Sequence, residues 1–218
     1  MMKPIFFFLC LWSFMTQLQA REDALIKLPG NIRLDMENKK VLIPIELVNL
    51  SGALEFILST GKAKDYESLL STAIKGHDLH FALTSLGFMA RVDVEKDADK
   101  NSMDLALFVQ FSDTKEIRPL TDMLIWSNKK KVTDNHFIFQ GSYFRPVNGR
   151  NVYEADTSLN LVAAMLSDDM VVGPAFKVGN PYEAEGDAPA LLPKAEALPK
   201  LGTKGDLIIA PYVQDKGK

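Results

Sequence analysis

The side chains best able to do chemistry gather between residues 61 and 80 of the sequence. Lys64, Glu67 and Ser68 stand close together, and His77 and His80 follow them. Two histidines three positions apart share one face of a helix, where they could present two imidazoles to a metal ion with Glu67 as a third ligand. The same spacing fits two histidines that lie on the solvated side of an amphipathic helix or cap it. We prefer this second interpretation, because a short motif in one sequence often matches by chance.

The remaining candidates suit binding better than catalysis. Ser68 stands beside Glu67, but an activated serine needs a base within hydrogen-bond reach and an oxyanion site, and no Gly-x-Ser-x-Gly elbow frames it. A carboxylate at Glu67 favours the first turn of a helix instead. Trp126, with nearby aromatic residues, could line a ligand groove or pack in the core. No catalytic residue is assigned. The predicted binding residues are Lys64, Glu67, Ser68, His77, His80 and Trp126.

Charge and missing motifs exclude several classes of function. The sequence has no phosphate loop, dinucleotide glycine fingerprint, His-Glu-x-x-His or calcium loop, so no cofactor is predicted. The formal net charge is −3, and the only dense basic run is 129–131, between two strand-like segments. Nucleic acid and anionic membrane surfaces are therefore poor candidate partners.

Alternation of apolar and polar residues predicts the elements that position these side chains. The pattern is that of half-buried strands, and the connections are short, which favours antiparallel pairing. The predicted strands are a hairpin over 32–36 and 41–47, then 54–58, 103–111, 123–126, 137–140, 152–154 and 159–165. A helix is predicted over His77–Leu86 and a shorter one over Tyr66–Ala73. The predicted fold class is α+β, a mostly antiparallel sheet with one helical region at about 65–87 packed on it.

The N-terminus has the three-part layout of a secretory signal peptide. Lys3 precedes an apolar run of about a dozen residues, too short to cross a bilayer as a stable helix, and polar residues follow. We expect cleavage after Ala20. Cys10, the only cysteine, lies inside the apolar run, so the mature chain would contain no disulfide. The predicted location is periplasmic or secreted, with no membrane span after cleavage.

The rest of the chain is predicted to form one domain and a tail. The domain covers 21–180, and the tail, 181–218, begins with a stretch rich in Pro and Ala that resembles a linker. Near its end, Leu207–Ala210 could add an edge strand or contact a partner.

Several separated blocks of the sequence resemble the YdjY-domain proteins of bacteria. They are 61–70, 77–83, 86–88, 124–126, 137–142 and 153–163, in the family's order, within about 40–172. The family commonly has a histidine just before the Glu-Ser pair, where this chain has Tyr66, which argues against a catalytic set of His, Glu and Ser. His80 matches the family's other histidine. The resemblance implies a domain type without implying a reaction.

Two hypotheses of function follow. The first is a non-enzymatic binding module of the cell envelope, whose partner is another envelope protein or a small ligand. The second is a hydrolase or metal-dependent enzyme that uses Glu67, His77 and His80. The second hypothesis requires that these three side chains converge on one ligand.

Overall fold

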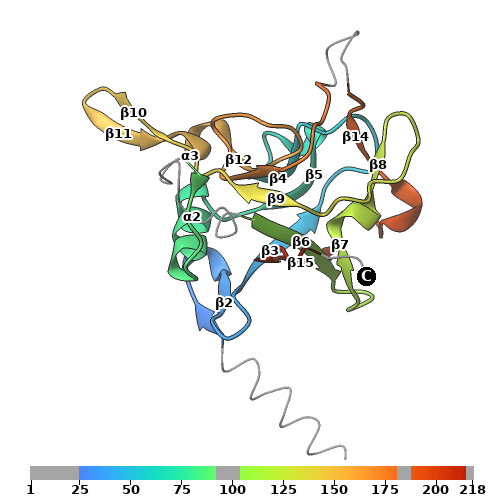
Figure 1. The fold of residues 1–218 in the computed structure, drawn as a ribbon, viewed down its shortest axis with the longest axis horizontal. Helices are drawn as coiled ribbons and strands as arrows, with labels where there is room; N and C mark the ends of the chain where they lie inside the picture. Colours follow the sequence, from blue (N-terminus) through green and yellow to red (C-terminus); the bar gives the residue numbers. More distant parts are fainter. Residues whose placement is uncertain (1–24, 92–103, 181–187, 215–218) are drawn as a thin grey trace, which may run out of the picture.

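The centre of the molecule is a closed β-barrel of mixed strand direction. The computed structural model describes residues 25–91, 104–180 and 188–214. Within this part, eight strands form the ring (Figure 1). In order they are β3 (Lys40–Leu47), β15 (Lys204–Pro211), β6 (Asp104–Phe111), β9 (Phe137–Phe139), β13 (Val172–Pro174), β12 (Asn160–Ala163), β4 (Phe56–Thr60) and β5 (Ser68–Thr72), and β5 pairs with β3 to close the ring.

The barrel corrects the expected fold in two respects. The protein is β-rich and most neighbouring strands are antiparallel, as predicted. However, β4 pairs with β5 and β12 pairs with β13 in parallel, and the sheet closes on itself. Closure depends on pairings between distant segments, which the alternation within each strand does not reveal.

Smaller elements extend from this ring. Strands β1 (Ile26–Lys27) and β2 (Arg33–Asp35) continue the sheet beyond β3, β7 (Ile117–Pro119) pairs with β6, and β14 (Leu191–Pro193) pairs with β8 (Leu124–Trp126). Strands β10 (Phe144–Val147) and β11 (Arg150–Tyr153) form a separate hairpin that projects from the barrel (Figure 1). Short 3-10 turns occupy Pro29–Asn31, Asp65–Glu67, Leu120–Met123 and Ala195–Ala197. Among the described residues, no helix is long and apolar enough to cross a membrane.

The core follows the period of the strands. In β3, Val41, Ile43, Ile45 and Leu47 are buried, while the residues that alternate with them are partly or largely exposed. A barrel of eight strands has an interior just wide enough for such side chains to fill. Leu207 and Ile209 of β15 complete the same apolar cluster. The chain thus obtains its stability from burial of apolar surface.

Helix α2 (Gly76–Ser85) forms where the sequence predicts it. Leu79, Ala82 and Leu83 are its buried stripe, and Gly87, with φ 84°, lies just beyond its C-terminal end. A second short helix, α3 (Glu154–Ser158), packs against it. The approach is close at Gly76, where a Cβ atom would lie 2.7 Å from the Cβ of Ala155. A glycine at this position therefore lets the two helices meet.

The helix predicted over Tyr66–Ala73 is wrong. Only the turn Asp65–Glu67 is helical, and the chain then enters barrel strand β5. All five residues of β5 are buried, so the segment lacks the alternation that marks a half-exposed strand. The helical region expected at 65–87 is therefore confined largely to α2.

The tail predicted at 181–218 and its edge strand also need correction. Strand β15 is a central strand, paired with β3 on one side and β6 on the other, and β14 pairs with β8. The described end of the chain therefore belongs to the domain. Residues 181–187 of the expected linker, and the signal peptide predicted at 1–20, lie outside the described residues.

The central place of β15 predicts a large effect of mutation. We expect Leu207→Ala to lower the free energy of unfolding by about 2 to 5 kcal/mol, because it opens a cavity in the barrel core. Val213→Ala, just beyond the strand at a residue that is 82% exposed, should change it by less than about 0.5 kcal/mol. Urea titration followed by circular dichroism measures both. Equal, small effects would mean that β15 does not lie in the core.

Candidate functional site

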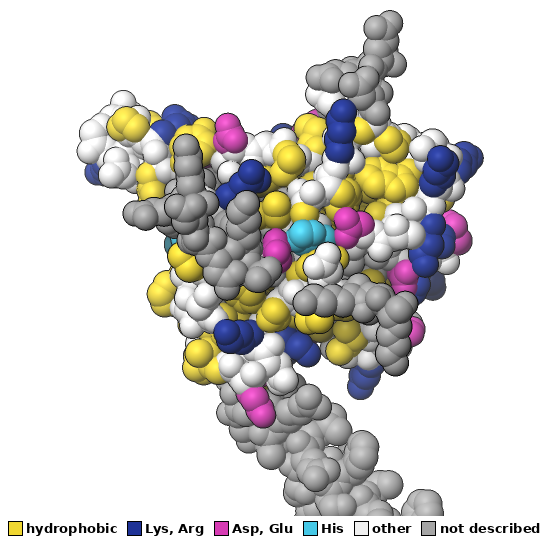
Figure 2. All heavy atoms as spheres, viewed as in Figure 1, with side chains coloured by type: hydrophobic (Ala, Val, Ile, Leu, Met, Phe, Trp, Pro, Cys, Tyr) yellow, Lys and Arg dark blue, Asp and Glu magenta, His cyan; other side chains and the backbone are white. Residues whose placement is uncertain are grey.

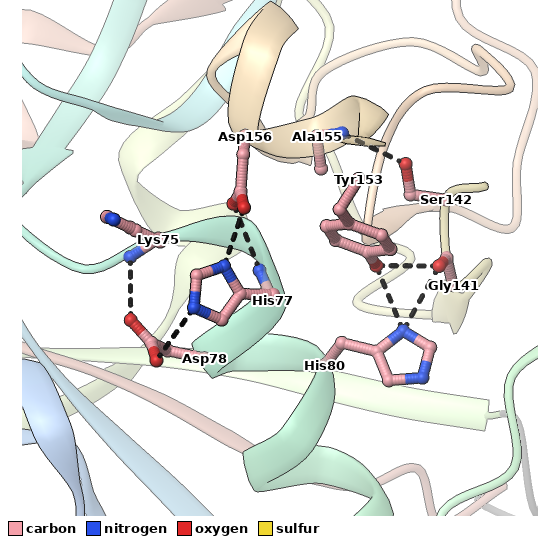
Figure 3. A network of polar contacts seen from close by, with 9 residues as sticks. All are labelled: Lys75, His77, Asp78, His80, Gly141, Ser142, Tyr153, Ala155 and Asp156. Carbon is pink, nitrogen blue, oxygen red and sulfur yellow. Dashed lines mark hydrogen bonds and ion pairs between the residues drawn. The ribbon is translucent and has the colours of Figure 1, made fainter. Parts of the chain in front are cut away.

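His77 lies between two carboxylates at the N-terminal end of α2. Its Nδ1 is 2.5 Å from Oδ2 of Asp156, and its Nε2 is 3.4 Å from Oδ1 of Asp78 (Figure 3). The backbone N–H of His77 also donates to Asp156, at 3.1 Å from Oδ1. Half of the His77 side chain, 51%, remains exposed. The ring is thus fixed in orientation but accessible from solvent.

Asp156 serves as a cap for α2 although it belongs to another helix. It comes from α3, 79 residues away along the chain, and satisfies a backbone donor that the first turn of α2 leaves free. Asp78 accepts a hydrogen bond from the backbone N–H of Lys75 at 3.3 Å, which closes the same turn. A carboxylate at a helix N-terminus is favoured by the dipole of the helix. The contacts of His77 therefore join α2 to α3.

His80 points away from His77, toward the chain that follows β9. Its Nδ1 lies 3.1 Å from the carbonyl oxygen of Gly141 and 2.9 Å from the hydroxyl of Tyr153 (Figure 3). The Tyr153 hydroxyl donates to the same carbonyl at 2.6 Å. Because a carbonyl oxygen only accepts, Nδ1 of His80 must carry a proton. The ring also packs edge-on against Phe139 and Tyr153, at centroid distances of 5.1 and 5.7 Å.

Ser142, next to Gly141, links two backbone segments through its hydroxyl. Its hydroxyl accepts from the backbone N–H of Ala155 at 3.1 Å and donates to the carbonyl of Asp169 at 2.8 Å. The side chain is buried and points toward α3 in Figure 3, away from the ring of His80. Ser142 therefore fixes the start of α3 and does not form a serine-histidine pair with His80.

Lys64, Glu67 and Ser68 form a second cluster. The side chain of Glu67 is buried and binds Lys64 Nζ at 2.6 Å. This hydrogen bond raises the pKa of Lys64 above its usual value of 10.5, although partial burial opposes the shift. The Lys64 ammonium also lies over the ring of Phe56, 5.2 Å from its centroid. Ser68 donates to the carbonyl of Lys64 at 2.7 Å and shares a hydrogen bond with Ser59. The cluster holds the connection between β4 and β5.

Trp126 belongs to neither cluster. It packs edge-on against Phe176, at a centroid distance of 5.8 Å, and lies in β8. Figure 1 shows β8 and α2 on opposite sides of the molecule. Phe137 and Phe139 of β9 are fully buried in the core.

The structure therefore separates the residues proposed as metal ligands. His77 binds Asp156, His80 binds Gly141 and Tyr153, and Glu67 binds Lys64. Across residues 25–91, 104–180 and 188–214, no group of three or more His, Cys, Asp or Glu side chains is placed to hold a metal ion. The three positions do not form one ligand set. Sequence reasoning missed Asp156 and Tyr153, the partners of the two histidines, because no local pattern links residues so far apart.

The projecting hairpin β10–β11, which we call the arm, is the other distinctive surface near this site. Phe144 is 65% exposed and Tyr143, which precedes it, is 43% exposed. Asn148 and Gly149 form its turn, both with positive φ, as a tight two-residue hairpin requires. Figure 2 shows hydrophobic and basic side chains on this projection.

The base of the arm is attached to the site. Tyr153, at the end of β11, contacts both the ring of His80 and the ring of Phe144, the latter at a centroid distance of 5.0 Å. Arg145 of β10 forms an ion pair with Glu154 of α3. The arm is thus attached to α2 through Tyr153 and His80, and to α3 through Arg145 and Glu154.

Comparisons with models of protein families, with curated proteins and with solved structures found no match. The resemblance to the YdjY-domain proteins therefore stays a prediction from the sequence, and the function has to be argued from the geometry.

The ion pair of Lys64 predicts a stability effect that depends on pH. Lys64→Met should lower the free energy of unfolding by about 1 to 3 kcal/mol at pH 8, because the buried carboxylate of Glu67 loses its partner. Since the pKa of Lys64 is raised in the folded state, the pair stabilises fully below pH 10.5 and loses its effect as pH rises through the folded pKa. Urea titrations at pH 8 and at pH values above 10.5 should show the difference from wild type shrinking. A difference that stays constant would contradict this account.

The capping of α2 by Asp156 leads to a second prediction. Asp156→Ala should cost about 0.5 to 2 kcal/mol of unfolding free energy and accelerate hydrogen exchange at the His77 amide, because the first turn of α2 loses an acceptor. Asp168→Ala removes an exposed carboxylate from a nearby loop and is the matched control. Exchange measured by NMR that is equally fast in both variants would show that Asp156 does not cap the helix.

Proposed function

We propose that the mature chain is a non-enzymatic binding module of the cell envelope, periplasmic or secreted, that contacts another envelope protein through the arm. The observation that carries the proposal is the exposure of Tyr143 and Phe144 on a hairpin outside the barrel. Large aromatic rings gain most when they leave water at an interface, and they are typical of the central residues of such contacts.

The construction of the arm supports this proposal. A two-stranded hairpin by itself is only marginally stable in water, yet this one is held in place by Tyr153 and by the ion pair of Arg145. A surface fixed before binding loses less conformational entropy on association. The contacts that hold this exposed hairpin in one orientation are expected if the hairpin binds a partner.

The backbone of the arm indicates how a partner would bind. In the register of the hairpin, Arg145 and Val147 face β11 with their hydrogen-bonding groups, so the groups of Pro146 face outward. Proline has no N–H to donate, so it obstructs the addition of another strand to β10. A partner would therefore contact the side chains of the arm more than the backbone hydrogen-bonding groups along β10.

The charge of the arm favours an acidic partner surface. Residues 143–153 contain no acidic side chain; of their two arginines, Arg145 is paired with Glu154 and Arg150 is exposed at the turn, although the whole chain is negative. A partner with an apolar groove edged by carboxylates would complement it. Such a partner fits the arm better than nucleic acid does, given the net charge of −3.

The rival hypothesis, a hydrolase or metal-dependent enzyme on Glu67, His77 and His80, has less support because the three side chains bind different neighbours. Elemental analysis of the mature protein, purified without chelators or an affinity tag, tests it. Stoichiometric metal that is lost when His77 and His80 are changed to alanine would favour the enzyme over our proposal.

Photo-crosslinking tests the arm directly. A photoreactive phenylalanine analogue at position 144 of the full chain, expressed in its native host, should give a specific crosslinked product with an envelope protein. Phe144→Ser in a tagged chain should reduce recovery of that protein at least about tenfold, because the ring is lost from the contact. Leu201→Ser removes another largely exposed apolar side chain, outside the arm, and should not reduce it. A crosslink to lipid or to a second copy alone, or none in folded protein, would overturn the proposal.

A further inference from the structure

A pocket of about 370 Å³ lies beside the capped end of α2, apart from the arm. It is open to solvent and is bordered by the turn after β4, the residues between β5 and α2, and the end of α3. Because β4 and β5 run parallel, both of the first two segments leave the barrel at the same edge. The lining residues are Thr60, Gly61, Lys62, Ala63, Ala73, Lys75, Asp156 and Leu159.

The charges in this pocket are unbalanced. Lys62 and Lys75 both line the pocket, and within the part of the chain that the structure describes neither side chain has an ion pair or a hydrogen-bond acceptor. Asp156 is the one acidic residue of the lining, and both of its oxygens are bound by His77. Its charge is thus already committed to the imidazole and the helix end. Among the described residues of the lining, two lysines face one aspartate, so the lining carries an excess of positive charge.

The wall that carries Lys62 is held in a fixed shape. The N–H of Gly61 donates to the carbonyl of Thr72 at 3.0 Å, and the hydroxyl of Ser71 donates to the carbonyl of Gly61 at 2.8 Å. The turn after β4 is therefore tied to β5, whose end leads to Lys75. A wall that is already ordered loses less conformational entropy when a ligand binds.

We propose that this pocket binds a small organic anion whose carboxylate or phosphate group lies between Lys62 and Lys75. Charge-assisted hydrogen bonds from ammonium groups to such oxygens are the strong ones in proteins. The side chains of Ala63, Ala73 and Leu159 would contact a short apolar body, and Thr60 adds a hydroxyl. The helix end itself is not the anion site, because Asp156 already occupies it.

The site goes beyond the binding of a protein partner by the arm, and neither depends on the other. The pocket lacks the arm residues in its lining, and the arm contributes no lysine. Failure of the crosslinking experiment would not bear on the proposed anion site. Failure of anion binding would not bear on the proposed role of the arm.

NMR titration of the isotope-labelled mature protein tests the proposal with two probes, inorganic phosphate and succinate, at constant ionic strength. We expect saturable shifts of the amides of Gly61, Lys62 and Lys75 with at least one probe. Saturation by phosphate alone identifies a phosphate ligand, and saturation by succinate alone identifies a carboxylate, and either supports the site.

A charge-matched pair of variants separates a site from general attraction. Lys62→Met with Lys75→Met should weaken the binding about tenfold or more, since both ammonium groups are lost. Lys129→Met with Lys130→Met removes the same charge from an exposed turn and should leave the affinity unchanged. Equal weakening by both pairs, or linear shifts without saturation for both probes, would overturn the proposal.

Discussion

Closure of the barrel depends on strand β3, which pairs with β15 along one edge and with β5 along the other. These pairings join the beginning of the domain to its last strand and to the segment that leads into α2. Each brings together residues far apart along the chain, so the loss of chain entropy must be compensated by the apolar side chains that the barrel encloses. Val41, Ile43 and Leu207 are among these and are fully buried.

The candidate sites lie where the chain leaves this barrel. Helix α2 follows β5, the arm follows β9, and α3 precedes β12. Their relative positions are set by the strands and then fixed by a few polar contacts, chiefly those of Asp156 and His80. Gly76 makes the arrangement possible, because a side chain there would collide with Ala155. The two histidines therefore serve as links between segments in this structure.

The proposed binding surfaces differ in physical character. The arm presents aromatic rings and arginines on a rigid projection, which suits contact with another macromolecule. The proposed anion pocket has two lysines in its lining, which suits a small anion. The contact between α2 and α3 connects the two surfaces. Arg145 holds the arm to Glu154 of α3, and Tyr153 holds it to His80 of α2. Asp156 of α3 lines the pocket. The two proposed surfaces are separate, so occupation of one would leave the other accessible.

The sequence by itself determined the elements whose pattern is local. Strands β3 and β6 alternate, and the stripe of α2 recurs every three or four residues, so each could be predicted from its own residues. It also located Lys64, Glu67, Ser68, His77 and His80, because their types and spacing are visible along the chain.

Tertiary structure alone decided what these elements and residues do. Strand β5 is buried throughout and has no period, and β15 became central only through its two neighbours. The partners of the histidines, Asp156 and Tyr153, lie more than seventy residues away. Hydrogen bonds and ion pairs act over a few ångströms in space, whatever the separation in sequence. The periodicity that specifies a strand or helix therefore carries no information about which side chain will meet another.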